Sequence, residues 1–165
     1  MIKNLLKMFN TTLYVQIWHD RIKVTDIKTN AVFDQKPLVQ IETKSNGIKF
    51  VTAIGNQAMV NVVNPFLHPR TLLNDFYVAE KLLQKIVIQL IGKKFISPIP
   101  AIIIHPMEKT EGGLTMIEIR AFEELAQGVG ARKSVVYQGA EMSISEINFE
   151  QLIDTQKNNS WFVKW

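Results

Sequence analysis

The spacing of apolar residues changes along this chain from a period of two to the period of a helix, and this change limits the folds it can adopt. Residues 12–18 and 21–27 alternate between apolar and polar side chains, as half-buried strands do. Residues 37–43 and 48–53 repeat the alternation around the turn Ser45-Asn46-Gly47. An Asn-Gly pair between such runs is a strong hairpin signal, so the first third is predicted to be an antiparallel meander.

The middle of the chain carries the helical period. Apolar residues recur from Val78 to Ile91 at three- and four-residue spacing, with Asp75 as a suitable N-cap and Gly92 as a stop. The wholly apolar run 101–104 follows two prolines and is typical of a buried strand.

A second helix, a further strand and a third helix complete the predicted elements. We expect the second helix to end at Gly128 and Gly130 and a buried strand over residues 134–137. Residues 143–153 predict a weaker third helix. The apolar side of the second helix is expected to consist of Met116, Ile119, Phe122, Leu125 and Ala126.

This order of elements predicts an α/β fold, a mixed sheet in which an antiparallel meander is followed by parallel strands flanked by helices. The 165 residues, 47% of them hydrophobic, suit one domain, and no repeat, linker or low-complexity segment interrupts them. We therefore expect an N-terminal amphipathic segment, residues 1–9, followed by a single domain over residues 10–165.

Composition excludes several classes of function. The net charge of +4 is spread along the chain without a basic stripe interleaved with aromatics, so we expect no nucleic acid as a partner. Without cysteine there can be no disulfide and no thiolate metal site. The apolar start is too short for a signal peptide, and lysines interrupt the longest apolar stretch, so we expect no membrane span.

Three strings of residues resemble one family. The segments DFYVAEKLLQKIVIQ (75–89), FISPIPAIIIHP (95–106) and IRAFEELAQGVGAR (119–132) resemble the MreB-like bacterial actins, the rod shape-determining protein family, and so does the opening MIKNLLKMF followed by LYVQI. The resemblance reaches to about residue 142 and covers the first domain of that family only.

The resemblance implies an actin-like ATPase domain of the ribonuclease H-like class, with three antiparallel strands joined by parallel ones. MreB-type proteins bind ATP between two such domains, form filaments and lie on the inner membrane surface. It therefore also implies a cytoplasmic protein, peripheral on the inner membrane.

The family's first phosphate loop, Asp-x-Gly-Thr after a strand, is degenerate in this sequence. Its glycine lets backbone N–H groups approach the phosphate, and its aspartate helps to organise the metal ion. The matching residues are Gln16, Trp18 and His19, so an uncharged amide replaces the carboxylate and an indole replaces the glycine. We expect loss of ATP binding, no cofactor and no enzymatic activity.

The other candidate catalytic and metal-binding residues are weak. Glu118 matches the family's water-positioning glutamate, but without a triphosphate we expect it to be an inactive charge on a helix face. The family's Glu-Glu-Pro segment reads 138–140 Gln-Gly-Ala, and the second domain's phosphate stretch is missing. His19, His68 and His105 lack zinc-ligand spacing, so we expect structural or surface histidines and no metal site.

Both ends of the chain are candidate binding segments. In a helix, Ile2, Leu5, Leu6 and Phe9 share one face with Lys3 and Lys7 beside it, an arrangement suited to an anionic membrane or to a partner chain. The alternative is a helix folded back on its own domain. At the other end, Trp161, Phe162 and Trp165 could dock on a groove, or cover the face that a second domain covers in relatives.

The sequence therefore predicts a non-catalytic actin-like protein with a cytoskeletal or cell-shape role. Its expected partner is an MreB-type filament or a second copy of itself, as a homodimer, near the membrane. Two alternatives stay open: the ATP-binding half of an actin-like ATPase completed by a separate second domain, and a relic domain with a different ligand in the old cleft.

Overall fold

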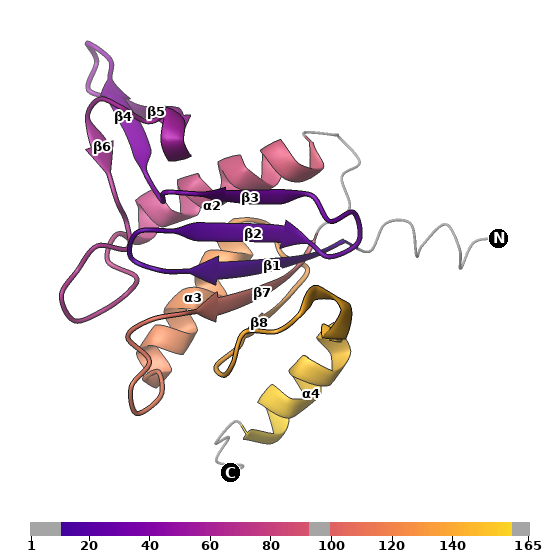
Figure 1. Cartoon of the computed structure of the whole chain (residues 1–165). Helices are drawn as coiled ribbons and strands as arrows, with labels where there is room; N and C mark the ends of the chain where they lie inside the picture. Colours follow the sequence, from indigo (N-terminus) through magenta and orange to yellow (C-terminus); the bar gives the residue numbers. More distant parts are fainter. Residues whose placement is uncertain (1–10, 93–99, 160–165) are drawn as a thin grey trace.

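The computed structural model describes residues 11–92 and 100–159, which form two sheets and the helices around them (Figure 1). The strands are β1 (Thr12–Ile17), β2 (Ile22–Asp26), β3 (Val32–Gln35), β4 (Val39–Thr43), β5 (Lys49–Ile54), β6 (Val62–Val63), β7 (Ala101–Pro106) and β8 (Lys133–Val136). The α-helices are α2 (Phe76–Ile91), α3 (Met116–Gly128) and α4 (Phe149–Asn159), and single 3₁₀ turns cover Gly55–Gln57 and Ile144–Glu146.

The larger sheet has the order β3-β2-β1-β7-β8. Strand β1 pairs antiparallel with β2, and β2 with β3, whereas β7 runs parallel to both β1 and β8. An antiparallel meander joined to parallel strands is the predicted fold class, which is confirmed.

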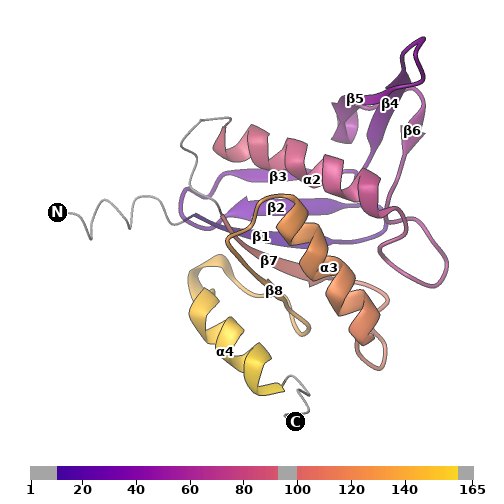
Figure 2. The same cartoon turned by 180° about the vertical axis from the view of Figure 1, so that it is seen from behind.

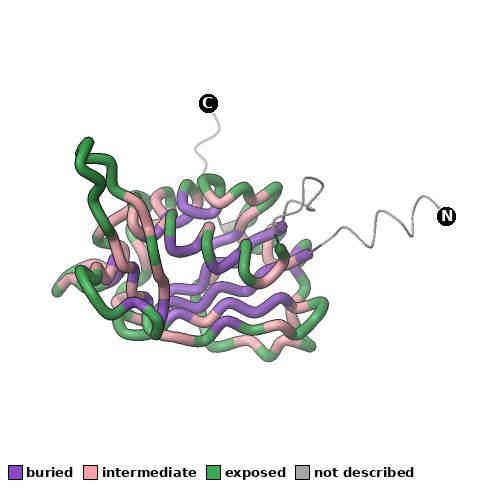
Figure 3. The backbone as a smooth tube through the Cα atoms, turned by 90° about the horizontal axis from the view of Figure 1, so that it is seen from above, coloured by how far each residue is buried: buried purple, intermediate pink, exposed green. Residues whose placement is uncertain are grey.

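Helices cover both faces of this sheet. Helices α2 and α3 lie on one face and α4 on the other, as the two opposite views show (Figures 1 and 2). The main core fills the α2/α3 side, with Leu13, Val15 and Ile17 of β1 among its buried residues, and a smaller cluster around Tyr14 and Ile103 lies toward α4. The central strands are therefore buried on both sides, as the tube coloured by burial shows (Figure 3).

The second hairpin belongs to a separate sheet, which corrects the expectation of one continuous meander. Strands β4 and β5 pair antiparallel, and β6 completes a three-stranded sheet of order β5-β4-β6 that projects away from the main sheet (Figure 1). The predicted turn is confirmed: Gly47 has φ of +82°, a conformation that favours glycine, and the Asn46 side chain accepts a hydrogen bond from the Ile48 N–H.

Capping residues set where the helices begin. The Asp75 carboxylate accepts from the Val78 N–H at 3.1 Å and starts α2 as predicted, and Gly92 ends it. Thr115 is the N-cap of α3 and forms a capping box with Glu118. Met116 therefore lies in the first turn, where it is 78% exposed, so its assignment to the buried side was wrong.

The third helix begins later than predicted. Residues 144–146 form only a 3₁₀ turn, and α4 starts at Phe149 because the Asn148 side chain accepts a hydrogen bond from the Gln151 N–H at the helix start. The buried ring of Phe149 anchors α4 against the smaller core cluster. No helix within residues 11–92 and 100–159 is long and apolar enough to cross a membrane.

Candidate functional site

The carboxyl ends of the three parallel strands meet at one edge of the main sheet. Trp18 and His19 follow β1, Met107 and Glu108 follow β7, and residues 137–141 follow β8. In open α/β sheets, ligands bind outside the carboxyl ends of the strands, so this edge is the candidate site. The fold brings all three degenerate-loop residues, Gln16, Trp18 and His19, to it.

Gln16 faces the α4 side of this edge and is almost completely buried, with 1% of its surface exposed. Its Nε2 donates to Oε1 of Glu141 at 2.8 Å and lies 3.9 Å from the sulfur of Met107. The side-chain amide therefore links β1 to the segments that follow β7 and β8, and its donor group is engaged within the chain.

A backbone hydrogen bond and an arginine side chain stabilise the tight turn after β1. The Trp18 N–H donates to the carbonyl oxygen of Arg21 at 2.8 Å, and the Arg21 guanidinium lies over the Trp18 ring, 4.8 Å from its centroid. Arg21 also makes a two-pronged ion pair with Asp34, with hydrogen bonds of 2.7 and 2.6 Å. The indole is therefore held in place by a paired cation at a half-buried position.

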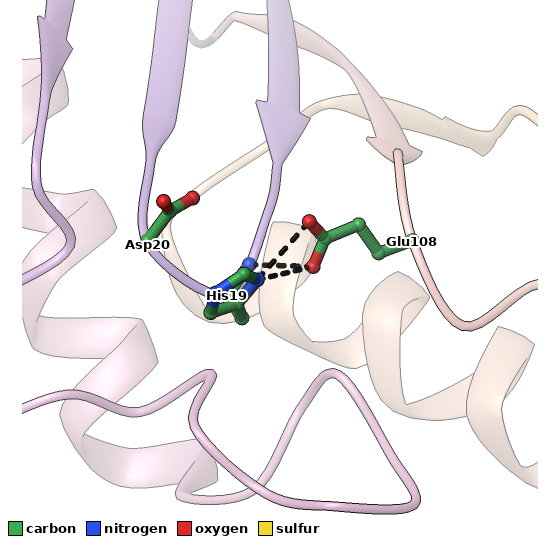
Figure 4. A group of neighbouring side chains, drawn as sticks. All are labelled: His19, Asp20 and Glu108. Carbon is green, nitrogen blue, oxygen red and sulfur yellow. Dashed lines mark hydrogen bonds and ion pairs between the residues drawn. The ribbon is translucent and has the colours of Figure 1, made fainter.

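His19 and Glu108 join the first turn to the loop after β7, although 89 residues separate them in sequence (Figure 4). The backbone N–H of His19 donates to Oε2 of Glu108 at 3.0 Å, and His19 Nδ1 lies 2.8 Å from the same oxygen. Partial burial raises the pKa of Glu108, but the hydrogen bonds from the His19 backbone and imidazole outweigh this and lower it overall. Since the ionised carboxylate only accepts, the Nδ1 nitrogen carries the proton.

A buried polar chain runs behind this edge and was not anticipated from the sequence. The hydroxyl oxygen of Tyr14 lies 2.6 Å from Nδ1 of His105, and Nε2 of His105 lies 3.0 Å from the carbonyl oxygen of Gly139. A carbonyl oxygen cannot donate, so Nε2 carries the hydrogen, Nδ1 accepts from the tyrosine, and the Tyr14 oxygen in turn faces the Met142 N–H at 3.4 Å.

Burial governs the titration of this pair. Desolvation lowers the pKa of His105 below its usual value, against the opposing effect of its hydrogen bond to Gly139. Desolvation also raises the pKa of Tyr14 to about 12. The Tyr137 ring packs edge-on against the imidazole at 4.7 Å. The expectation that His105 is structural agrees with this geometry, since both ring nitrogens have partners within the fold.

Glu118 and the segment after β8 are also engaged locally. Oε2 of Glu118 accepts from the Thr115 N–H at 2.8 Å, which is one half of the capping box, and also from the Thr115 hydroxyl at 2.9 Å. Oε1 of Gln138 accepts from the Leu114 N–H at 2.7 Å, and the Ala140 carbonyl accepts from the Tyr137 hydroxyl at 3.1 Å. These contacts hold the loops at the strand ends together.

An open hollow of about 450 Å³ lies beside His19. It is lined by His19, Leu67, His68, Pro69 and Lys109, and the Lys109 amine donates to the His68 carbonyl oxygen. Asp20 stands next to His19 in the turn, so that ligand atoms of His19, Asp20 and Glu108 all lie within 4.8 Å of one another. Sequence spacing could not have revealed this group, because Glu108 is brought beside His19 only by the pairing of β1 with β7.

The predicted contact residues at the two chain ends cannot be placed in this way. Ile2, Lys3, Leu5, Leu6, Lys7 and Phe9, and Trp161, Phe162 and Trp165, all lie outside the described residues.

Comparison with known proteins agrees with the resemblance in the sequence. No family model matches the chain. The cell shape-determining protein MreB of Escherichia coli K12 is 25% identical over 171 residues, covering 93% of this chain and 48% of that protein, and MreB of Pasteurella multocida is 26% identical over 74% of this chain and 38% of that protein. The chain thus spans about half the length, or less, of the MreB proteins it matches.

A shorter stretch, 41% of the chain, is 37% identical to the uncharacterized protein YjaA of Escherichia coli K12, of which it covers 58%.

Solved structures with the same fold are bacterial actin homologues. MreB5 of Spiroplasma citri bound to ADP aligns with a TM-score of 0.54 at 17% identity, covering 77% of this chain and 38% of that one. A non-polymerising mutant of MamK bound to AMPPNP aligns with a TM-score of 0.60 at 14% identity, covering 77% and 40%. The chain is therefore similar in sequence to MreB, a cell shape-determining protein, over most of its own length, and it has an actin-like fold.

Proposed function

We propose that this chain is a non-catalytic MreB-like protein that acts in cell shape by binding a protein partner, and that its strand-end edge no longer holds ATP. The observation that carries the proposal is the bond from the His19 backbone N–H to Glu108. In the resemblance drawn above, backbone N–H groups of this loop face a phosphate. Here an internal carboxylate takes the place of that anion.

The side chains at the edge do not suit a triphosphate with its metal ion. Gln16 has no charge to organise a cation, and its amide already donates to Glu141. Trp18 places an indole where close backbone approach needs glycine, and its own N–H is bonded within the turn. Glu108 and Glu141 add negative charge beside the strand ends, which would repel phosphate.

The test is the thermal unfolding of the full chain with and without ATP and magnesium. A ligand at 100 times its dissociation constant would stabilise the folded chain by about 2.7 kcal/mol. The proposal predicts an unchanged melting temperature, with MreB5 of Spiroplasma citri, whose structures hold ADP and AMPPNP, measured alongside as a nucleotide-binding control. A saturable rise would favour the alternative, an ATP-binding half completed by a separate second domain.

The proposed partner is an MreB-type filament or a second copy of this chain. Relatives are named as cell shape-determining proteins, and the side chains of Met59 and Val60, just before β6, and of Val62 in β6 are apolar and exposed. Met59 and Val60 are 82% and 60% exposed. Contiguous exposed apolar residues are typical of interaction surfaces.

Attachment to the inner membrane through residues 1–9 is the second part of the proposal. It is supported by the apolar face and lysines of that segment in the sequence. Co-sedimentation with anionic liposomes should fall when residues 1–9 are deleted, and equal binding by the full and shortened chains would contradict membrane attachment.

A further inference from the structure

We propose that His19, Asp20 and Glu108 form a binding site for a divalent transition-metal ion of the Zn²⁺ class. The three side chains come from two segments that only the fold brings together, the β1–β2 turn and the loop after β7 (Figure 4). The site lies at the strand-end edge but uses none of the family's phosphate chemistry.

The ligand atoms lie close enough together to converge on one ion. Zinc lies about 2.0–2.2 Å from nitrogen and oxygen ligands, so two ligands of one tetrahedral ion are roughly 3.4 Å apart. His19 Nδ1 lies 2.8 and 3.0 Å from the two oxygens of Glu108, and all three groups lie within 4.8 Å of one another. Binding would require the His19 and Glu108 donors to separate by roughly 0.5 Å and the exposed Asp20 to turn toward them.

Two of the ligands are held before any ion arrives. Glu108 is positioned by the His19 backbone N–H, and the His19 carbonyl oxygen accepts from the Asn64 side chain at 2.7 Å. These bonds fix the backbone that carries the imidazole, as outer contacts do in metal sites. An ion would displace the proton from Nδ1.

Asp20 distinguishes this group from a simple ion pair. A histidine and a glutamate in contact are explained by their mutual attraction alone. The hydrogen bond to Asp34 and, to a smaller degree, the charge of Asp20 raise the pKa of the neighbouring Arg21. Within residues 11–92 and 100–159, however, the Asp20 carboxylate makes no hydrogen bond or salt bridge, and it lies beside the His19–Glu108 pair. A divalent cation would balance the two carboxylates and occupy all three ligands.

The chemistry of the donors selects the kind of ion. One imidazole and two carboxylates favour Zn²⁺, Co²⁺ or Ni²⁺ over Mg²⁺ and Ca²⁺, which prefer oxygen alone. The open hollow beside His19 leaves room for water or an external ligand to complete the coordination. The nearby Lys109 amine is bonded to the His68 carbonyl oxygen rather than to Glu108.

Calorimetric titration of the full, tag-free chain with ZnCl₂ and CoCl₂, in the absence of nucleotide, tests the site. We expect one ion per chain, and binding at least about tenfold weaker in His19→Gln, Glu108→Gln and Asp20→Asn, since loss of even an outer-shell partner weakens metal binding tenfold or more. His68→Gln and Glu111→Gln are the matched controls, a second histidine at the same hollow and an exposed carboxylate of the same loop.

Absence of binding, or equal binding by the folded His19→Gln variant, would overturn the proposal. Loss of binding in His68→Gln with retention in Asp20→Asn would do the same, by placing the ion elsewhere in the hollow. Circular dichroism of each variant checks that it is folded. Because nucleotide is left out, a negative result leaves the account of the lost ATP site unaffected.

Discussion

The carboxylate of Glu108 accepts two hydrogen bonds from His19, one from its backbone N–H at 3.0 Å and one from Nδ1 at 2.8 Å. The backbone N–H that follows Trp18 is therefore bonded to a residue of the same chain. This contact ties the β1–β2 turn to the segment after β7.

Replacing Tyr14 by phenylalanine should destabilise the chain. The change removes the donor to His105 Nδ1 and leaves that buried nitrogen without its partner. A buried polar group left unsatisfied costs about 1–3 kcal/mol. Urea unfolding measures the loss. Tyr77→Phe is the matched control because Tyr77 is 78% exposed, and it should change stability by less than about 0.5 kcal/mol. Equal stability of both variants would contradict the proposed buried bond.

Stability should fall as the pH drops below about 6.5. The pKa of His105 is lowered in the folded chain from its ordinary value of 6.5, so between that value and its folded pKa the unfolded chain binds more protons. The free energy of unfolding therefore rises with pH through this window.

Glu108 affects the free energy of unfolding over a different pH range. Its folded pKa lies below 4.5, so the stability it contributes is present above that value and is lost as the pH falls through the folded pKa. Urea unfolding at a series of pH values, with the His105 ring followed by NMR, separates the two. A His105 that titrates at or above 6.5 would contradict the assignment.

Local sequence signals were sufficient for most elements of the fold. Asp75 and Gly92 bound α2 because capping depends on a few neighbouring residues, and the Asn46-Gly47 turn fixes the β4–β5 hairpin for the same reason. Strand β3 was missed because its residues, Val-Phe-Asp-Gln, do not alternate in polarity: the apolar Val32 is exposed and only Phe33 is buried. The split into two sheets depends on long-range pairing, which periodicity does not report.

The sequence could predict only those site residues that lie next to one another along the chain. Gln16, Trp18 and His19 were identified from their order after a strand. Glu108 and Glu141, their partners, are set by the parallel pairing of β1 with β7 and by the chain after β8. Nothing in the spacing of these residues along the chain indicates that they meet.

Glu118 should contribute to stability and not to catalysis. Glu118→Ala removes half of the capping box and should cost about 0.5–2 kcal/mol, as the loss of a cap does. Glu118→Gln is the matched control, because glutamine at this position can still accept from the Thr115 N–H. Urea unfolding of both variants gives the comparison, and an equal loss in the two would show that charge rather than capping matters.

The exposed apolar residues just before β6 should carry partner binding. Met59→Ser combined with Val60→Thr should weaken co-sedimentation with filaments of an MreB partner, since both side chains are exposed and apolar. Ile117→Thr is the control, a similarly exposed apolar residue at the start of α3. If the control weakens co-sedimentation and the double variant does not, the partner surface lies on α3 instead.

A crystal structure of the full chain grown with AMPPNP and magnesium tests the central claim most directly. The account predicts that the Trp18 ring keeps its place under Arg21, that the His19 N–H still donates to Glu108, and that no nucleotide lies at the ends of β1 and β7. Phosphates bound to the backbone beside Trp18, with a cation alongside and Glu108 displaced, would contradict it.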